Sequence, residues 1–514
     1  MPSAVSTPSL PRGQEKPVVE APTSHQAATS VVASARFDPI QENGAIFEDA
    51  PGQRWPKPRL ALVITGRQEG YFEPCGCAGM DKMKGGMDRR DKLLKMLKND
   101  WECPRVAMDV GGLAKGRDHQ AEIKFQAMVD ALERMGYSAI GLGVGDLQLS
   151  EGELMAVTAS NPGQPPSPFV SANVGLIQWD PAILRPYRII EAAGMKIAVT
   201  GILGSSFQKE IRNPAILMAD AAKQLTSLLP VLKEQKPDHM VLLAFASKEE
   251  SEALGQKFPD FDIVVTAGGP PTPPKDAKTI PQTRSLIVEV GEKTTEAIVL
   301  GLYDDPKHPL RYQRVPLDSR FDKKSPDAAS NALSEMQQIM ADYQIQLKAV
   351  GFEGLGIHPS PHPQQQLLGR FVGSEQCKTC HEGSYDKWKK TPHAHAFQTL
   401  EKLAVPRIFD PECISCHVIG WDTQNFFPYQ YGYQSTAATP KLINVGCESC
   451  HGPGEAHVAA ENGTDGALKE KLQQALTLTK EEARKRLRCQ NCHDLDNSPA
   501  FNFDTYFPKI EHHD

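Results

Sequence analysis

Four copies of one short pattern, two Cys separated by two residues and followed directly by His, lie near the end of the chain. The copies are Cys377-Lys-Thr-Cys380-His381, Cys413-Ile-Ser-Cys416-His417, Cys447-Glu-Ser-Cys450-His451 and Cys489-Gln-Asn-Cys492-His493. Two Cys on one turn can both form thioethers with one porphyrin, and the adjacent His reaches the iron from the same side. Zinc sites and disulfides also use paired Cys, but neither requires a His after every second Cys. The pattern therefore predicts four covalently attached c-type haems.

The second axial ligand of each iron must come from elsewhere, and the composition limits the choice. The chain holds 14 Met, but none follows Met340. The other His in this part of the chain are His358, His362, His393, His395, His457, His512 and His513. We therefore expect two His ligands on most haems, which keeps the potentials low. A solvent-exposed position is the alternative for each of these His and the favoured one for His395 and His513.

Five stretches of the C-terminal part resemble the tetrahaem cytochrome c-554 family of ammonia-oxidising bacteria, which takes electrons from hydroxylamine oxidoreductase. They are FVGSEQCKTCH, YDKWKKTPHAHAF, DPECISCHVIGW, VGCESCHGPGEAH and RCQNCHDLDNSPAF, and the resemblance covers about residues 369–514. The implied distal and proximal ligands are His457 with His381, His393 with His451, and His512 or His513 with His493. The resemblance also implies a five-coordinate haem on His417, with an open iron face.

Upstream, residues 59–321 alternate between apolar strands and amphipathic helices. Strands are predicted at 59–65, 105–110, 138–142, 168–174, 188–192, 195–201, 239–245 and 262–266, and helices at 86–98, 120–135 and 219–233. Two later strands, 285–290 and 296–303, are predicted to form an antiparallel pair. This order of elements predicts an α/β domain that contains some antiparallel sheet.

Several motifs of this α/β part resemble the metallophosphoesterase fold of periplasmic 5′-nucleotidases. They include Glu73-Pro74-Cys75-Gly76-Cys77 and Gly85-Gly86-Met87-Asp88-Arg89-Arg90, followed by AMDVGGL, MGYSAIGLGVGDL and SANV. The resemblance covers roughly residues 59–316 and implies a four-layer α/β/β/α sandwich. That class binds two metal ions with Asp, His and Asn at strand ends. Here Asp109 is the one clear match, and Thr65-Gly66-Arg67 stands in place of D-x-H. We therefore expect a catalytically degenerate domain.

Two features of the α/β part allow more than one interpretation. Cys75 and Cys77, with Cys103 nearby, could form a redox disulfide, bind metal or hold sulfur species. Alternatively, these Cys only staple a loop or are buried thiols. The doublet Arg89-Arg90 could be an anion site near the start of its helix, or a solvated surface pair, which is the favoured interpretation.

The chain divides into four predicted segments. A disordered tail covers residues 1–56, because it is rich in Ser, Thr, Pro, Ala and Gln without apolar periodicity. The α/β domain covers residues 57–320. A helix at 326–349 and a linker at 351–369 make up residues 321–368. Residues 369–514 form the tetrahaem domain, which is expected to be mainly α-helical.

Composition narrows the classes of partner and compartment. A formal net charge of −7 argues against nucleic acid as a main partner. No apolar run approaches the ~18 residues of a membrane span. The start MPSAVSTPSLPRGQEK lacks the basic and apolar segments of a secretory signal. Covalent haem, however, is attached outside the cytoplasm, so we expect an exported or periplasmic protein.

The leading functional prediction is a multihaem c-type cytochrome that transfers electrons to or from a redox partner protein, with an accessory degenerate phosphoesterase-like domain. One alternative is a haem-dependent oxidoreductase that acts on a small nitrogen or sulfur compound at a five-coordinate haem. Another is a metal-dependent phosphoesterase-type hydrolase with a fused cytochrome. The sequence names no general acid or base beside the five-coordinate iron, and an electron-transfer protein is favoured over an enzyme.

Overall fold

A computed structural model describes residues 48–50, 53–74, 83–160, 163, 165–293, 295–307, 309–322, 332–485 and 489–512. Inside the predicted disordered tail, β1 (Glu48–Ala50) and β2 (Gln53–Arg54) pair as short antiparallel strands. The predictions for residues 1–47, and those for Cys75, Cys77 and His513, lie outside the described residues.

A five-stranded sheet with the order β15-β14-β3-β4-β5 forms the first half of the α/β domain. Its strands are β3 (Leu60–Thr65), β4 (Arg105–Asp109), β5 (Tyr137–Ile140), β14 (Glu296–Leu302) and β15 (Leu310–Pro316). β3, β4 and β5 are parallel because α1 (Met87–Asn99) and α2 (His119–Arg134) connect them. Every residue of β3 is buried, as expected for a strand covered on both faces.

A six-stranded sheet with the order β12-β13-β11-β10-β8-β7 forms the second half. Its strands are β7 (Tyr187–Ala192), β8 (Met195–Leu203), β10 (His239–Ser247), β11 (Ile263–Gly268), β12 (Lys278–Thr279) and β13 (Leu286–Glu289). The helices α5 (Ala221–Glu234) and α6 (Lys248–Lys257) connect its parallel strands. The strand predicted at 168–174 is mostly irregular, and β6 (Val174–Leu176) pairs instead with β9 (Ile216–Met218) in a separate small sheet.

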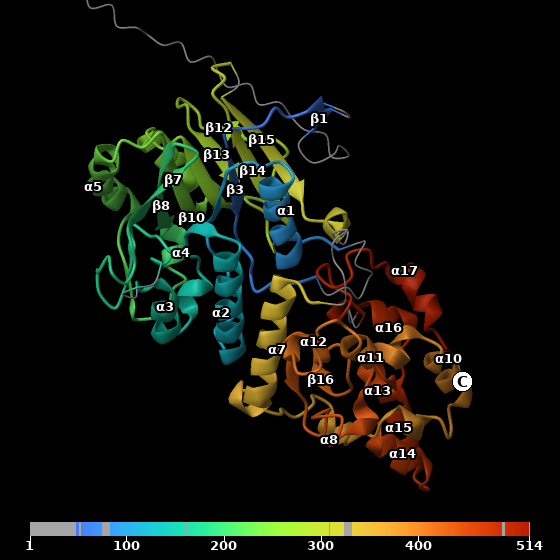
Figure 1. Ribbon diagram of the computed structural model, residues 1–514. Helices are drawn as coiled ribbons and strands as arrows, with labels where there is room; N and C mark the ends of the chain where they lie inside the picture. Colours follow the sequence, from blue (N-terminus) through green and yellow to red (C-terminus); the bar gives the residue numbers. More distant parts are fainter. Residues whose placement is uncertain are drawn as a thin grey trace, which may run out of the picture.

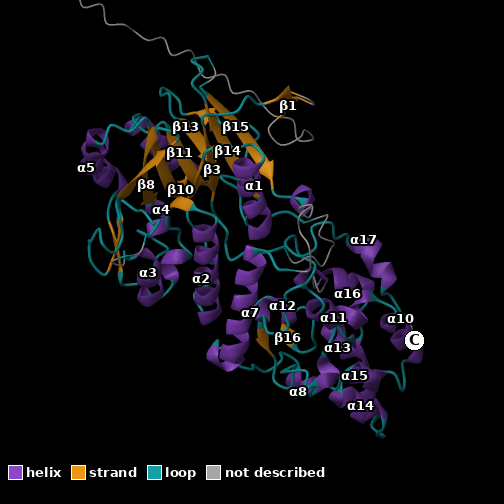
Figure 2. Ribbon diagram, in the orientation of Figure 1, coloured by secondary structure: helices purple, strands orange, loops and turns teal. Residues whose placement is uncertain are grey.

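The two sheets pack face to face. Alternate residues of β10 divide between two cores: Val241 and Leu243 join the core that includes β3, β4, α1 and α2, whereas Leu242 and Ala244 join the core beneath α5 and α6. Each sheet therefore has helices on its outer face and the other sheet on its inner face, as Figure 2 shows. The predicted four-layer α/β/β/α sandwich is confirmed.

The predicted antiparallel pair at 285–290 and 296–303 is wrong. β13 runs parallel to β11 in the six-stranded sheet, and β14 runs antiparallel to β3 and β15 in the five-stranded sheet. The chain therefore crosses from one sheet to the other between Glu289 and Glu296. All residues of both strands are buried. An unbroken apolar run identifies a buried strand, but it carries no information about the strand's partner.

The segment between the two parts of the molecule is structured from residue 332 onward, and residues 326–331 of the predicted helix lie outside the described residues. The helix α7 (Glu335–Gly354) begins at a capping box formed by Ser334 and Gln337, later than the predicted start. The predicted linker packs on the C-terminal region, where the Ser360 amide donates to Pro428 O at 3.1 Å. It also contains α8 (Gln365–Leu368). In Figure 1, α7 lies between the α/β domain and the orange-to-red C-terminal region.

The C-terminal region consists of short helices joined by long loops. The helices include α9 (Ser374–Cys377), α10 (Glu382–Lys389), α11 (Ala396–Glu401), α12 (Pro411–Ile414), α13 (Cys447–His451), α14 (Glu455–Glu461), α15 (Gly466–Leu476), α16 (Lys480–Lys485) and α17 (Phe503–Tyr506). One two-stranded sheet, β16 (Trp421–Asp422) with β17 (Phe427–Pro428), accompanies them. Within the described part of the chain, no helix has both the length and the apolar character needed to cross a bilayer.

Candidate haem sites

Each Cys-x-x-Cys-His motif forms a single helical turn. In the first and fourth motifs the His amide donates to the carbonyl of the first Cys, at 2.9 Å for His381 and 2.8 Å for His493. The third motif is α13 itself, and α12 contains Cys413 of the second motif. One turn places both Cys and the His on the same side of the helix, which is the geometry that attachment to one porphyrin needs.

Three pairs of imidazole rings lie close together in the C-terminal region. The ring centroids are 6.3 Å apart for His381 and His457, 6.0 Å for His393 and His493, and 5.9 Å for His451 and His512. A metal–nitrogen bond of about 2.0 Å on each side, plus about 1.1 Å from nitrogen to ring centre, gives a centroid separation of about 6.2 Å. All three spacings therefore suit an iron held between two His.

The pairing differs in part from the one that the family resemblance implied. His457 lies beside His381 as expected. His393 lies beside His493, not His451, and His512 lies beside His451, not His493, so these two predicted pairs are exchanged. The physical reason is that the C-terminal segment folds back, with Lys387 donating to Glu511 O. This carries His512 past the fourth motif to the third.

The hydrogen bonds of several rings decide which ring nitrogen could bind a metal. The Nδ1 atoms of His417, His451 and His512 lie 2.6, 2.7 and 2.8 Å from the carbonyl oxygens of Ala396, Leu476 and Ile510. A carbonyl only accepts, so Nδ1 carries the proton and Nε2 carries the lone pair that a metal would bind.

Burial keeps the inner rings neutral, which ligation also requires. It lowers the pKa of His393 to about 4, with a further contribution from the neighbouring His493. Burial also lowers the pKa values of His417 and His493. These imidazoles therefore carry no charge at neutral pH, and a neutral imidazole is the form that binds iron.

Two other His of this region have different roles. His395 is exposed, as the favoured alternative predicted. The Nδ1 atom of His362 accepts the Gln364 amide at 3.2 Å, which places the ring proton on Nε2. The His362 ring packs edge-on against Phe371 and Tyr429, with centroids 5.7 and 4.8 Å away.

The Cys of the four motifs lie near one another in twos. The thiol of Cys377 in the first motif interacts with that of Cys447 in the third. The thiol of Cys416 in the second interacts with that of Cys492 in the fourth. Haems attached at these Cys would be close enough to one another for electrons to pass between them.

At the carboxyl ends of β3 and β4, buried Asp109 is fully engaged by neighbouring side chains. Its Oδ2 accepts from Thr65 Oγ1 at 2.6 Å and from Gln68 Nε2, and its Oδ1 accepts from the Gly111 amide at 2.9 Å. The guanidinium of Arg90, which is completely buried, lies 3.7 Å away. Burial raises the pKa of Asp109, and Arg90 opposes that rise. An arginine cation therefore compensates the carboxylate that a metal would otherwise bind.

The other residues at the positions that bind metal in this class also make contacts within the protein. Arg67 donates to Gly269 O at 2.9 Å and pairs with Glu292, so its side chain bridges the loops after β3 and β11. Asp146 accepts three backbone amides, from Gly112, Ala114 and Gly143, each at 2.8 Å. Burial raises the pKa of Asp146 to about 6. Among the described residues no cluster of three or more His, Cys, Asp or Glu could hold a metal ion. These residues do not fit a dinuclear metal centre.

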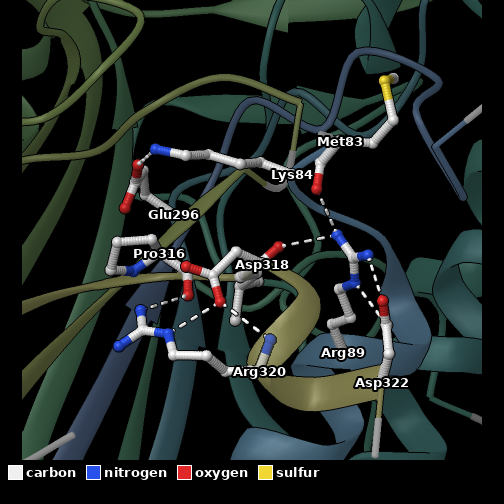
Figure 3. Close-up of polar contacts among 9 residues, drawn as sticks. Met83, Lys84, Arg89, Glu296, Pro316, Asp318, Arg320 and Asp322 are labelled. Atoms are coloured by element: carbon white, nitrogen blue, oxygen red, sulfur yellow. Dashed lines mark hydrogen bonds and ion pairs between the residues drawn. The ribbon is translucent and has the colours of Figure 1, made fainter. Parts of the chain in front are cut away.

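Both interpretations of the Arg89-Arg90 doublet were wrong, because both side chains are buried and paired. Arg89 binds the Asp322 carboxylate through two hydrogen bonds, Nε to Oδ1 at 2.8 Å and Nη2 to Oδ2 at 2.6 Å. Its Nη1 also donates to Met83 O at 2.6 Å, as Figure 3 shows. Arg89 therefore fastens the start of α1 to the segment after β15.

Cys103, the third Cys outside the haem motifs, is a buried thiol. Its sulfur lies 3.3 Å from Pro104 O, and only 2% of the residue is exposed. Burial raises its pKa, which keeps it protonated and unreactive. The disulfide, metal and sulfur-carrier predictions for Cys75 and Cys77 concern residues outside the described part.

Comparison with known proteins shows what the C-terminal region is similar to. The family model for cytochrome c554 and c-prime matches residues 376–452. Cytochrome c-554 of Nitrosomonas europaea is 32% identical over 149 residues, which cover 25% of this chain and 60% of that protein. The C-terminal region resembles a multihaem cytochrome of the c-554 type. The resemblance inferred from the motifs is confirmed, and c-type haem is the cofactor that this cytochrome family implies.

Several solved structures are similar to the α/β domain. The 5′-nucleotidase precursor of Thermus thermophilus is 17% identical with a TM-score of 0.46, and the match covers 57% of this chain and 59% of that chain. The sulfate thiohydrolase SoxB of the same genus is 13% identical with a TM-score of 0.44, covering 57% and 61%. The chain thus spans about 60% of the length of each of these relatives.

Sequence reasoning missed the groups that support the haem motifs. The carbonyl of Ala396, which orients His417, leaves no trace in the sequence because any residue has a carbonyl. Asp410 is different, because it stands in the cap-like run Asp-Pro-Glu directly before Cys413. Its side chain caps α12, accepting the Glu412 amide at 3.1 Å. An N-cap signal before a motif could have identified it.

Proposed function

We propose that this protein is an exported electron-transfer protein that binds four c-type haems and passes electrons between them and a redox partner protein. The observation that carries the proposal is the combination of four Cys-x-x-Cys-His turns with three imidazole pairs 5.9–6.3 Å apart. Bis-His ligation on His381, His451 and His493 gives low-potential haems suited to electron transfer. When bound, the haem would supply the one-electron chemistry, and the axial His of the protein would hold its iron.

The proposal assigns no hydrolytic role to the α/β domain. Arg90 lies 3.7 Å from Asp109, the one clear match to the metal ligands of this class, and Arg67 stands in place of the His of the D-x-H motif. Asp109 and Asp146 accept hydrogen bonds from neighbouring groups. A metal ion entering here would face a buried guanidinium and would have to displace existing hydrogen bonds. The domain instead serves as a support for the cytochrome part.

A haem count tests this function. The full chain, exported from a bacterium that has haem-attachment machinery, should show four haems in a pyridine haemochrome assay. The double substitution Cys489→Ala/Cys492→Ala should lower the count by one, whereas Cys103→Ala, outside any motif, should leave four. The native protein should be found in the periplasmic fraction. A count clearly below four in the unaltered chain would contradict the proposal.

A further inference from the structure

The turn that carries the second haem motif is seated directly on the α/β domain. The seat consists of Gln120 and Lys124 on α2 and Tyr343 and Gln344 on α7, and we call these four residues the helix seat. The seat is buried: Gln120, Lys124 and Gln344 are 6%, 8% and 5% exposed, and Tyr343 is 2% exposed. Figure 1 shows α12 next to α7, at the boundary between the two parts of the molecule.

Asp410 is the main attachment of α12 to the helix seat. Its Oδ1 accepts from Gln120 Nε2 and its Oδ2 accepts from Gln344 Nε2, both at 2.9 Å. The Gln120 amide also donates to Tyr343 Oη at 3.0 Å, which fixes its orientation. Because hydrogen bonds to a buried carboxylate are strong and directional, they hold the turn at one position on the α/β domain.

A charged pair lies beside this attachment. Lys124 Nζ is 2.5 Å from Glu412 Oε1, and the Tyr343 ring lies 5.9 Å from the same ammonium group. Only 9% of the Lys124 side chain is exposed, against 43% of the Glu412 side chain. Water therefore screens the lysine charge poorly and screens the glutamate charge more.

These charges act on the sulfur of Cys413, the first Cys of the second motif. Burial raises the pKa of the Cys413 thiol well above its usual value, and Asp410 and Glu412 raise it further, while Arg407 and Lys124 oppose the rise. Arg407 is itself 9% exposed and pairs with Glu73 of the α/β domain. A charge that acts on a thioether sulfur also acts on the haem attached to it.

We propose that the α/β domain forms one wall of the second haem site, and that Lys124 and Glu412 set the reduction potential of the haem on Cys413, Cys416 and His417. This inference rests on the proposed function, because it needs a haem on the second motif. Lys124 is a positioning and tuning residue, since it acts through its contact with Glu412 on the α12 turn. The lysine charge favours the reduced haem, and the glutamate charge disfavours it.

Four variants of the full-length haem protein test this role, read by spectroelectrochemical titration of the four midpoint potentials. Lys124→Gln should shift one midpoint to lower potential and leave three unchanged. Glu412→Gln should shift the same midpoint to higher potential, by less, because Glu412 is more exposed. The double variant should have midpoint potentials close to those of the unaltered protein. Lys124→Arg should leave all four midpoints unchanged, because it keeps the positive charge. Lys98→Gln, at an exposed position of α1, is the matched control and should shift nothing.

Opposite shifts from the two single variants exclude a merely structural role, because loosened packing would not reverse sign with the sign of the charge. Four haems with unmoved midpoints, or shifts of equal sign in both variants, would overturn this inference alone. Absence of haem from the second motif, shown by an unchanged haem count in Cys413→Ala/Cys416→Ala, would overturn the proposed function together with it.

Discussion

Replacement of Arg90 by methionine should destabilise the α/β domain strongly and in a pH-dependent way. Arg90 and Asp109 are both completely buried, 3.7 Å apart, and Arg90 Nη1 also donates to Thr65 Oγ1 at 3.3 Å. Methionine fills a similar volume but leaves the Asp109 carboxylate as a buried charge without a cation. Breaking a buried pair in this way costs about 3–5 kcal/mol in free energy of unfolding.

The sign of the pH dependence follows from Asp109. Burial already raises its pKa, and loss of Arg90 removes the group that opposes the rise. The folded state of the variant then binds a proton more readily than the unfolded state, in which the Asp pKa is about 3.9. The stability of Arg90→Met should therefore fall as pH rises from about 4 through the folded-state pKa, and its deficit should be smallest at acid pH.

The assay is urea unfolding of the intact haem protein at several pH values, followed by far-UV circular dichroism and by Soret absorbance. Arg90→Met/Asp109→Asn should recover more than half of the loss, because no charge remains buried. Arg117→Met, at an exposed position, should change stability by no more than about 0.5 kcal/mol. A decrease of less than about 1 kcal/mol in the free energy of unfolding of Arg90→Met would refute the view that Arg90 replaces a metal. A failure of Asp109→Asn to restore any of the lost stability would refute it too.

Three further results follow from the structure. His512→Ala should convert about one haem in four from low-spin to high-spin, because His451 loses the ring beside it. Electron paramagnetic resonance measures this conversion, and an unchanged spectrum would contradict the pairing of His451 with His512. Asp410→Ala should lower the free energy of unfolding by about 2–4 kcal/mol, since it removes the acceptor of two buried hydrogen bonds, from Gln120 and Gln344; a loss under about 1 kcal/mol would contradict it. Added Mn²⁺ or Zn²⁺ should neither raise the melting temperature nor produce phosphatase activity; tight binding at Asp109 would oppose this expectation.

Burial patterns explain which parts of the fold were predictable. β3, β4, α1 and α2 were predicted within one or two residues, because an apolar run or a helical apolar stripe is a local property of the sequence. The partner of β14 was not predictable in the same way, because every residue of that strand is buried and any other buried strand would fit its pattern. The doublet Arg89-Arg90 was assigned to the surface for a related reason: arginine is rarely buried, and its acidic partners lie far away in the sequence.

The haem motifs show the same division between local and distant information. The sequence by itself determined which Cys and His form each attachment turn, since five consecutive residues on one turn have a fixed geometry. It also indicates that His is the second axial ligand of most haems, because Met is absent after Met340. Only the tertiary structure decided that His512 faces His451 and His393 faces His493. Those pairs depend on how distant segments fold back on each other, which packing controls and spacing along the chain does not.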